Sequence, residues 1–302
     1  MQLKAQTKWG WMIAAYLFLA GLGAGAYVTG VIADFAGAEW ASVSKIGVAL
    51  GFPCVLLGTA FLIADLGTPA NFWRAYRKPG TSWVARGTII ISVFMVVGFI
   101  HIGLWLWPFG VLEDAAGARQ FIGVVGAIFA FGTMMYTGIL LGANRPIAFW
   151  STALVPVLFL VSALSTGIMA VMLIATIDGA AHSGPISTLV RIDVVLLVLE
   201  IVVVAMYLQA THRVPESRAA ARLVLAGSVA PLFWLGVALL GLAVPLALEL
   251  LGYYVLDGSS ATTVIASISG IIGGLCLRQV VLSGGIQAPL RAGRFEFAIP
   301  NT

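Results

Sequence analysis

Charged residues are scarce in this chain, and their scarcity excludes a soluble fold. Only 9% of the 302 residues are charged, whereas 61% are hydrophobic. A soluble domain carries about 25% charged residues, so this protein has too few to cover a water-exposed surface. Its apolar residues also occur in runs that are long enough to cross a bilayer as helices. The sequence therefore predicts an integral membrane protein.

Cysteine and histidine are almost absent, which limits the redox centres that the protein can hold. An iron–sulfur cluster typically takes four thiolates, but the only cysteines are Cys54 and Cys276. A membrane cytochrome b holds each haem between paired ligands, usually histidines on facing helices. Only His101 falls inside an apolar run, and His182 and His212 lie in loops on opposite sides. We therefore expect no haem and no iron–sulfur cluster in this protein.

Eight apolar runs are each long enough to cross a hydrocarbon core of about 30 Å at about 1.5 Å per residue. The run LFLAGLGAG (17–25) matches LFLVSALSTG (158–167) with one insertion, which suggests two related halves. We therefore predict an all-α integral membrane protein with eight transmembrane helices in two four-helix bundles, residues 1–145 and 146–302. The predicted spans are roughly 10–33, 43–66, 84–107, 119–143, 149–177, 189–210, 223–250 and 261–283.

Basic residues gather in the loops on the N-terminal side of these spans. The opposite loops are mostly acidic, with Lys45 and Arg119 as their only basic residues near the span ends. Because cytoplasmic loops are enriched in lysine and arginine, we expect both termini in the cytoplasm. The net charge of +4 comes from these loops and not from an arginine-rich segment, so no nucleic-acid partner is expected. The basic residues on the N-terminal side are Lys4, Lys8, Arg74, Arg77, Lys78, Arg145, Arg213, Arg218, Arg222, Arg291 and Arg294.

Tryptophans agree with these depths. Because tryptophan is enriched at both membrane–water interfaces, we expect these side chains to anchor the helices there. The expected interfacial residues are Trp9, Trp11, Trp73, Trp83 and Trp150 on the N-terminal side and Trp40, Trp105 and Trp107 on the other.

The stretch YLFLAGLGAG (16–25) concentrates small residues inside the first span. In a soluble helix, each glycine costs about 1 kcal/mol relative to alanine. In lipid, small residues allow helix backbones to approach one another closely. We therefore expect Gly21 and Gly25 on a helix contact face, or on a wall against which a flat ligand lies.

Three polar side chains are expected to meet on the N-terminal side of the first bundle. Tyr16 lies about 10 Å of helix beyond the Trp9–Trp11 pair, Tyr136 lies about 12 Å from the end of its span, and Asp65 closes the second span. Two phenols, a carboxylate and a glycine wall suit a flat ring with polar oxygens at its ends. Such a ring is a quinone, whose oxidation from quinol needs hydrogen-bond acceptors that pass protons on.

Structural roles for the same residues remain open at this point. Asp65 can cap its helix or pair with Arg74 or Arg86, and the tyrosines can hydrogen-bond between helices. Likewise, His101 near the far end of the third span can form an interhelical hydrogen bond, or belong to a second quinone site or a proton exit.

The sixth predicted span contains three charged residues, Arg191, Asp193 and Glu200. Ionisable residues inside a membrane are costly and are functional candidates by default. Glu200 follows Asp193 by two helical turns, so the two carboxylates share a face. With Arg191 they form either a polar track for protons through the second bundle or a buried structural ion pair.

Several of these motifs together resemble the NrfD-like, polysulfide-reductase-type family of membrane subunits. The matching segments are WGWMIAAYLFLAGLGAGAY (9–27), DLGTPANFWR (65–74), YTGILL (136–141) and FWSTALVPVLFLVSALSTG (149–167). The sequence departs from the family pattern at Met12, where some members have a polar residue, and at Thr68, where a basic residue is usual.

This resemblance implies a haem-free anchor that exchanges electrons between the quinone pool, menaquinone or ubiquinone, and a ferredoxin-like four-cluster iron–sulfur subunit. Through that subunit it implies a molybdopterin catalytic subunit or a multihaem cytochrome. It also implies a quinone site in the first bundle, at the face that docks the iron–sulfur subunit. Here that face is the N-terminal side, where Tyr16, Asp65 and Tyr136 are expected, in the inner membrane and facing the cytoplasm.

Two other classes of protein fit the composition. Two related bundles with buried carboxylates are common in secondary transporters, although no pair of broken helices corresponds between the halves. A purely structural anchor without a ligand is the third class. Quinone binding distinguishes the redox anchor from both.

Overall fold

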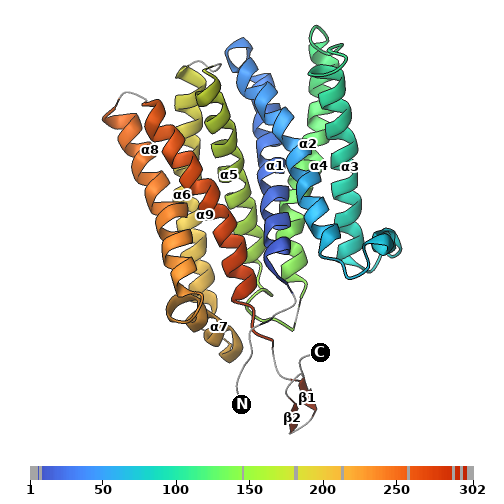
Figure 1. Cartoon of the computed structure of the whole chain (residues 1–302), viewed down its shortest axis with the longest axis vertical. Coiled ribbons are helices and arrows are strands. Elements are labelled where there is room, and N and C mark those ends of the chain that lie inside the picture. Colours follow the sequence, from blue (N-terminus) through green and yellow to red (C-terminus); the bar gives the residue numbers. More distant parts are fainter. Residues whose placement is uncertain are drawn as a thin grey trace.

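The chain forms a bundle of long helices with a short hairpin at its C-terminal end (Figure 1). The computed structural model describes residues 6, 9–144, 146–179, 183–211, 214–256, 259–287, 290–292 and 295–297. Seven residues named above lie outside this part of the chain: Lys4, Lys8, Arg145, His182, His212, Arg213 and Arg294. The helices are α1 (Trp11–Phe35), η1 (Ala38–Trp40), α2 (Ala41–Ala64), η2 (Pro69–Tyr76), α3 (Trp83–Trp105), α4 (Ala116–Gly142), α5 (Leu154–Asp178), α6 (Ser183–Ala210), α7 (Pro215–Ala226), η4 (Leu232–Ala243), α8 (Val244–Tyr254) and α9 (Ser260–Ser283).

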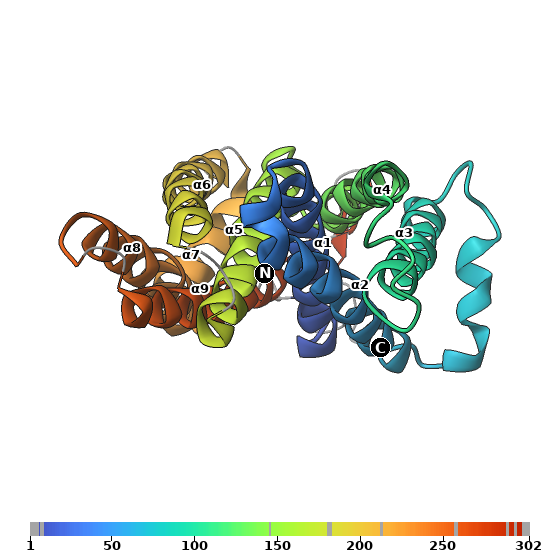
Figure 2. The same cartoon turned by 90° about the horizontal axis from the view of Figure 1, so that it is seen from above.

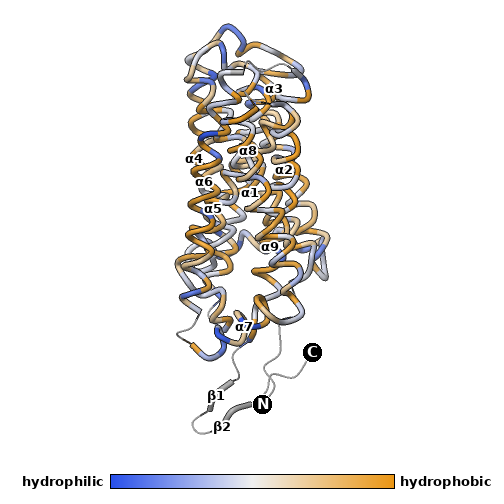
Figure 3. Tube along the Cα trace, turned by 90° about the vertical axis from the view of Figure 1, so that its left-hand side faces the viewer, coloured by the Kyte–Doolittle hydropathy of each residue, from blue (hydrophilic) through white to orange (hydrophobic). Residues whose placement is uncertain are grey.

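Within the described residues, seven helical segments are long and apolar enough to cross a membrane. They are α1, η1 with α2, α3, α4, α5, η4 with α8, and α9. The prediction of a helical, multi-pass membrane protein is therefore confirmed. The predicted sixth span falls within α6, which runs beside the seven in Figure 1. A full count of eight crossings stays a prediction. Figure 3 shows apolar residues along the length of the bundle and hydrophilic residues concentrated toward its ends.

The predicted seventh span, 223–250, is wrong at both ends. Residues up to Ala226 belong to α7, a separate short helix that begins at Pro215. Gly227 then adopts an extended conformation and ends α7. The crossing segment starts at Leu232, after Pro231, and continues to Tyr254. Its first half, η4, is a π-helix. Apolarity alone did not reveal the break, because Leu223–Ala226 are as apolar as the span that follows.

A two-stranded antiparallel hairpin follows α9, an element that an all-α prediction does not contain. It pairs β1 (Leu290–Ala292) with β2 (Phe295–Phe297), and Leu290 lies opposite Phe297. The hairpin lies beyond the end of the helical bundle (Figure 1), so it leaves the membrane-spanning architecture unchanged.

Helices α1 and α5 form the centre of the molecule. Helix α1 contacts α2, α4, α5 and α9, and α5 also contacts α4, α6 and α9. Viewed from above, α2, α3 and α4 lie on one side of this centre, and α6, α8 and α9 lie on the other (Figure 2). The division into bundles 1–145 and 146–302 stays a prediction. The contacts are in keeping with it, because helices that are close in the sequence lie on the same side of the centre.

Close packing between α1 and α5 depends on glycine. A Cβ atom at Gly25 would lie 2.1 Å from the carbonyl oxygen of Ala163, and one at Gly167 would lie 2.4 Å from the backbone nitrogen of Ala26. At Gly21 the nearest atom, Ala163 Cβ, would be 3.2 Å away. The helix-contact role predicted for Gly21 and Gly25 is therefore confirmed, and α5 occupies the space beside them.

Two of the expected interfacial tryptophans are buried instead. Trp150 is fully buried, and its indole nitrogen donates a hydrogen bond of 2.7 Å to the carbonyl of Val281. Trp105 is 3% exposed and stacks on His101. The expectation of membrane anchoring is wrong for these two residues, because sequence depth does not show which side of a helix faces the lipid. Trp11, Trp73, Trp83 and Trp107 are exposed, as expected.

Candidate functional site

The structure brings Tyr16 of α1 and Tyr136 of α4 together. Tyr16 is fully buried, and its hydroxyl has no hydrogen-bond partner in the described part of the chain. Tyr136 is 5% exposed and lies close enough to Tyr16 for an electrostatic interaction between the phenols. The Tyr136 ring fills the space beside Gly87 of α3, where a Cβ would lie 1.8 Å from the ring. A buried hydroxyl without a partner is costly, so Tyr16 suits a ligand that supplies a polar oxygen.

Asp65 lies nearer the N-terminal face than these phenols. It follows the last residue of α2, and its backbone N–H donates to the carbonyl of Phe61 at 3.0 Å. Gly58 packs against the backbone of Tyr16, and Asp65 follows Gly58 by seven residues, or about 10 Å of helix. The backbone of Asp65 therefore lies nearer the N-terminal face than the Gly58–Tyr16 contact, and a site shared by Asp65 and Tyr16 stays a prediction.

The ion pairs considered for Asp65 do not form. Among the described residues, its carboxylate has neither a hydrogen bond nor an ion pair. Arg86 instead donates to the carbonyls of Pro79 (2.9 Å) and Gly80 (2.7 Å) and lies over the Trp83 ring. The half-buried carboxylate of Asp65 is therefore unpaired among the described residues at this end of the bundle.

An open hollow lies between α3, α4 and α5 on the same side of the molecule. It has about 590 Å³ of empty space and is lined by Trp83, Ile139, Gly142, Thr152, Pro156 and their neighbours. Ile139 follows Tyr136 by three residues, which places the two on neighbouring positions of one helix face. The hollow thus offers a flat apolar molecule an approach toward Tyr136 from the side of the bundle.

His101 forms the interhelical hydrogen bond that was one of its predicted roles. Its Nδ1 lies 2.7 Å from the hydroxyl of Tyr27 in α1. The His101 ring stacks on the Trp105 ring. The Arg119 guanidinium also lies over the Trp105 ring, 4.8 Å from its centroid. A second quinone site or a proton exit at His101 stays a prediction.

Tyr27 was missed at the sequence level, although a signal for it exists. It follows Tyr16 by eleven residues, which is close to three helical turns, so both tyrosines occupy the same face of α1. Room for the Tyr27 ring comes from the neighbouring helices: a Cβ at Gly126 would lie 2.2 Å from its hydroxyl, and one at Gly51 would lie 2.7 Å from its ring. Helix periodicity therefore indicated a second polar position on the opposite side of the membrane from Tyr16.

A second polar cluster lies in the other half of the molecule. Asp193 of α6 is fully buried and Glu249 of α8 is 2% exposed. The two carboxylates interact electrostatically, and neither has a hydrogen-bond partner within the described residues. Two buried charges of the same sign cost several kcal/mol each, and a proton held between the carboxylates would relieve this repulsion.

Glu200 and Arg278 extend this cluster. Glu200 is 5% exposed, Arg278 of α9 is 1% exposed, and the two interact electrostatically across the bundle. The Arg278 guanidinium donates to Ser162 of α5, and Ser162 and Glu200 together line a small cavity. Residues of η4, which is a π-helix, also line this cavity. Such irregular helical segments are frequent at functional sites.

Arg191 does not join Asp193 and Glu200. It is exposed, it donates to the carbonyl of Ser187 at 3.3 Å, and it lies over the Tyr253 ring. It lies two positions before Asp193, so it faces a different side of α6. The cation that interacts with Glu200 is Arg278, and not Arg191 as the sequence had predicted. Arg278 comes from α9, which is distant from α6 in the sequence.

The fold and these clusters define a class: a multi-pass helical membrane protein with buried phenols in one half and buried carboxylates in the other. Among the described residues, no group of three or more histidine, cysteine, aspartate or glutamate side chains is placed to hold a metal ion.

The chain belongs to the family described as "Polysulphide reductase, NrfD", whose profile matches residues 1–289. It is similar to a polysulfide reductase polypeptide of Wolinella succinogenes, with 30% identity over 92% of this chain and 94% of that protein. It is also similar to protein NrfD of Escherichia coli K12, with 26% identity over 92% of this chain and 94% of the relative. A selenate reductase subunit of Mesobacillus selenatarsenatis is 23% identical over 95% of this chain and 76% of that protein.

Proposed function

We propose that this protein is the haem-free membrane subunit of a respiratory oxidoreductase, and that it exchanges electrons and protons between the quinone pool and a partner iron–sulfur subunit. The observation that carries the proposal is the buried hydroxyl of Tyr16, which has no hydrogen-bond partner among the described residues and interacts electrostatically with Tyr136. Membership of the NrfD family supports it, because its relatives include proteins named as parts of polysulfide and selenate reductases. The same membership favours a redox anchor over a secondary transporter.

In this proposal each polar residue of the first half has a separate role. Tyr16 and Tyr136 donate or accept hydrogen bonds at the oxygens of the quinone ring, which orients it. Asp65 accepts a proton and passes it toward the N-terminal face, since it lies about two helical turns nearer that face. The glycines Gly21 and Gly25 support the site indirectly, because they hold α1 against α5.

We further propose the topology and the partners that the family and the charge distribution favour. Eight helices would form two four-helix bundles in the inner membrane, with both termini in the cytoplasm. The basic N-terminal side would dock a ferredoxin-like four-cluster iron–sulfur subunit, and through it a molybdopterin enzyme or a multihaem cytochrome. The quinone would be menaquinone or ubiquinone.

The test is quinone content and quinol kinetics of the complex purified in mild detergent. Tyr136→Phe removes one hydrogen bond and is expected to weaken quinone binding about fivefold, equivalent to about 1 kcal/mol. Asp65→Asn is expected to slow quinol-linked turnover at least tenfold while the partner subunits stay bound. Tyr253→Phe is the matched control, because that tyrosine lies outside the first half and is 36% exposed. Wild-type quinone affinity in Tyr136→Phe and normal turnover in Asp65→Asn would disprove the proposed site.

A second function is favoured by the carboxylates of the other half. We propose that Asp193, Glu249 and Glu200 move protons through this half, with Arg278 as the counter-charge in place of Arg191. The supporting observation is that Asp193 and Glu249 are both buried and interact electrostatically, while their carboxylate oxygens have no hydrogen-bond partner among the described residues. A secondary transporter would use the same cluster for a substrate, and uptake of a solute by proteoliposomes of this protein alone would favour that alternative.

A further inference from the structure

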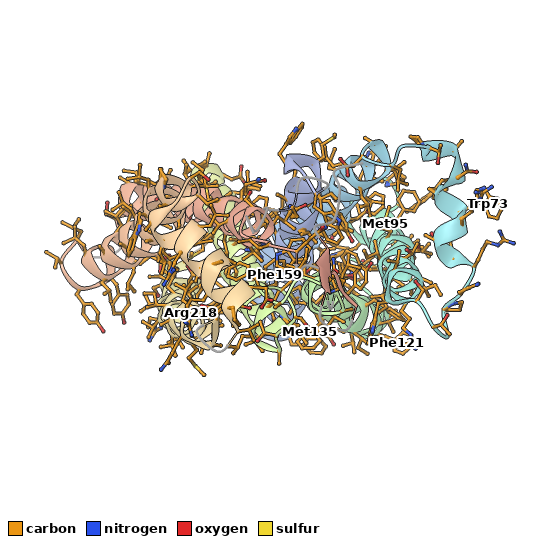
Figure 4. All side chains as sticks on the ribbon, turned by 90° about the horizontal axis from the view of Figure 1, so that it is seen from below. Trp73, Met95, Phe121, Met135, Phe159 and Arg218 are labelled. Atoms are coloured by element: carbon orange, nitrogen blue, oxygen red, sulfur yellow. The ribbon has the colours of Figure 1, made fainter. Side chains whose placement is uncertain are left out.

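The segment between α2 and α3 stands at the edge of the molecule. Its short helix η2 contacts α3 and the end of α2. The view from above shows η2 beside α3 at the far side of the bundle from α8 and α9 (Figure 2). From below, Trp73 of η2 lies at the outer rim (Figure 4). Because η2 directly follows one membrane-crossing helix and precedes another, it lies at the level where the membrane meets water.

An open hollow in this segment is lined by basic side chains. The hollow has about 930 Å³ of empty space, including its mouth. Its described lining contains Arg74, Arg77, Lys78, Ser82 and Val84 and no acidic residue. Within the described residues, none of the three cations forms an ion pair. Arg74 and Arg77 instead lie over the Trp73 ring, at 5.8 and 5.7 Å from its centroid.

The loop that carries these cations is held in place by other contacts. Arg86 donates to the carbonyls of Pro79 and Gly80, and the Ser82 hydroxyl caps the first turn of α3. The hydroxyl of Tyr76 lies 2.6 Å from that of Ser92, which ties the end of η2 to α3. The three cations are therefore presented by an organised loop, and none of them is needed for these contacts.

Exposed aromatic residues lie in the same segment and at the start of α3. Trp73, Phe72, Trp83 and Tyr76 are 50%, 46%, 44% and 39% exposed. Amphipathic aromatic rings at this depth are typical of the headgroup region of a bilayer. Trp73 lies at the outer rim of the bundle (Figure 4), where the edge of a membrane protein meets lipid, and this position favours a lipid over a soluble partner at the hollow.

We propose that the hollow binds the headgroup of an anionic phospholipid. The phosphate would lie between Arg74, Arg77 and Lys78, because guanidinium groups form paired hydrogen bonds with phosphate oxygens and lysine adds a point charge. Val84 and the aromatic rings would contact the glycerol and the first carbons of the acyl chains. This inference is independent of the quinone site.

The test measures lipid binding to the purified full-length protein by native mass spectrometry, with phosphatidylglycerol and phosphatidylcholine as probes. Arg74→Gln/Arg77→Gln is expected to weaken phosphatidylglycerol binding about 30-fold, since each basic residue near an anionic lipid surface contributes roughly fivefold. Arg218→Gln/Arg222→Gln is the matched control, because it removes the same charge on the same side of the molecule. It is expected to change binding less than about threefold.

Three results would overturn the proposal. Equal losses in the two double variants would show a general effect of net charge. Equal binding of phosphatidylcholine and phosphatidylglycerol would show apolar contact only, and displacement of the lipid by millimolar inorganic phosphate would show a site for the free anion. If the Arg74→Gln/Arg77→Gln variant kept its lipid but lost a partner subunit from the complex, the surface would be a protein-docking surface instead.

Discussion

The hydroxyl of Tyr27 lies 2.7 Å from Nδ1 of His101 and joins α1 to α3 in the interior of the bundle. Both side chains are buried, with exposures of 0% and 2%. The Nε2 atom of His101 and the indole nitrogen of Trp105, which stacks on it, have no partner among the described residues. The Tyr27–His101 bond is therefore the polar contact that fixes this histidine ring.

Tyr27→Phe is expected to destabilise the protein by about 1–3 kcal/mol, because it leaves buried Nδ1 of His101 without its partner. Thermal unfolding in detergent measures the effect. Tyr254→Phe removes a hydroxyl from a residue that is 75% exposed and serves as the control. A Tyr27→Phe variant as stable as the control would show that the hydrogen bond contributes nothing.

Alanine substitutions in α1 should destabilise the protein in the order of the space available to each new Cβ atom. Gly25→Ala places it 2.1 Å from the Ala163 carbonyl oxygen, and Gly21→Ala places it 3.2 Å from Ala163 Cβ. We expect Gly25→Ala to cost about 3 kcal/mol or to prevent folding, and Gly21→Ala about 1 kcal/mol.

Gly103→Ala in α3 is the control for these variants, because a Cβ there meets nothing within 4 Å. It is expected to be neutral or stabilising by up to about 1 kcal/mol, since alanine is the better helix former. Melting temperatures of the three variants give the comparison. Equal melting temperatures for Gly21→Ala and Gly103→Ala would contradict the α1–α5 contact as described.

Two ion pairs on the side opposite the N-terminus should differ in strength. Arg119 and Asp34 form contacts of 2.7 to 3.0 Å, with side-chain exposures of 15% and 9%. Lys45 and Glu113 lie 2.7 Å apart at exposures of 41% and 55%. Asp34→Asn is expected to cost about 3 kcal/mol, and Glu113→Gln well under about 1 kcal/mol, by thermal unfolding.

The exposed pair also has a defined pH dependence. The hydrogen bond from Lys45 lowers the pKa of Glu113 below its ordinary value of 4.5. A carboxyl group whose pKa is lower in the folded state stabilises the protein above the unfolded-state pKa, and this contribution disappears as the pH falls through the folded-state value. The small stability difference between wild type and Glu113→Gln should therefore be constant from about pH 6 to 8 and vanish as the pH falls below the folded-state pKa of Glu113. A difference that persists at low pH would show another cause.

Glu249→Gln is expected to reduce proton movement through the second half at least tenfold, because an amide cannot take up and release a proton as the carboxylate does. The measurement is the pH change inside proteoliposomes that contain the purified complex, during quinol-linked turnover. Glu39→Gln, at an exposed position, is the control. Unchanged proton movement in the Glu249→Gln variant would exclude Glu249 from the route.

The sequence by itself determined the membrane class, the positions of most spans, the family and several functional candidates. These follow from properties that act along one polypeptide: apolar length, charge in the loops, and helical periodicity that relates Asp193 to Glu200. The small residues of α1 also indicated a close helix contact before its partner was known.

Only the tertiary structure decided which residues meet across helices. Gly25 faces Ala163 of α5, Arg278 of α9 replaces Arg191 as the counter-charge of Glu200, and Asp65 pairs with neither Arg74 nor Arg86. It also showed Trp150 and Trp105 to be buried, and divided the predicted seventh span at Gly227. The physical reason is that a helix in a nearly uniform apolar sequence has several faces of similar hydrophobicity. Which of them is buried depends on the shapes and charges of neighbours that are distant in the sequence.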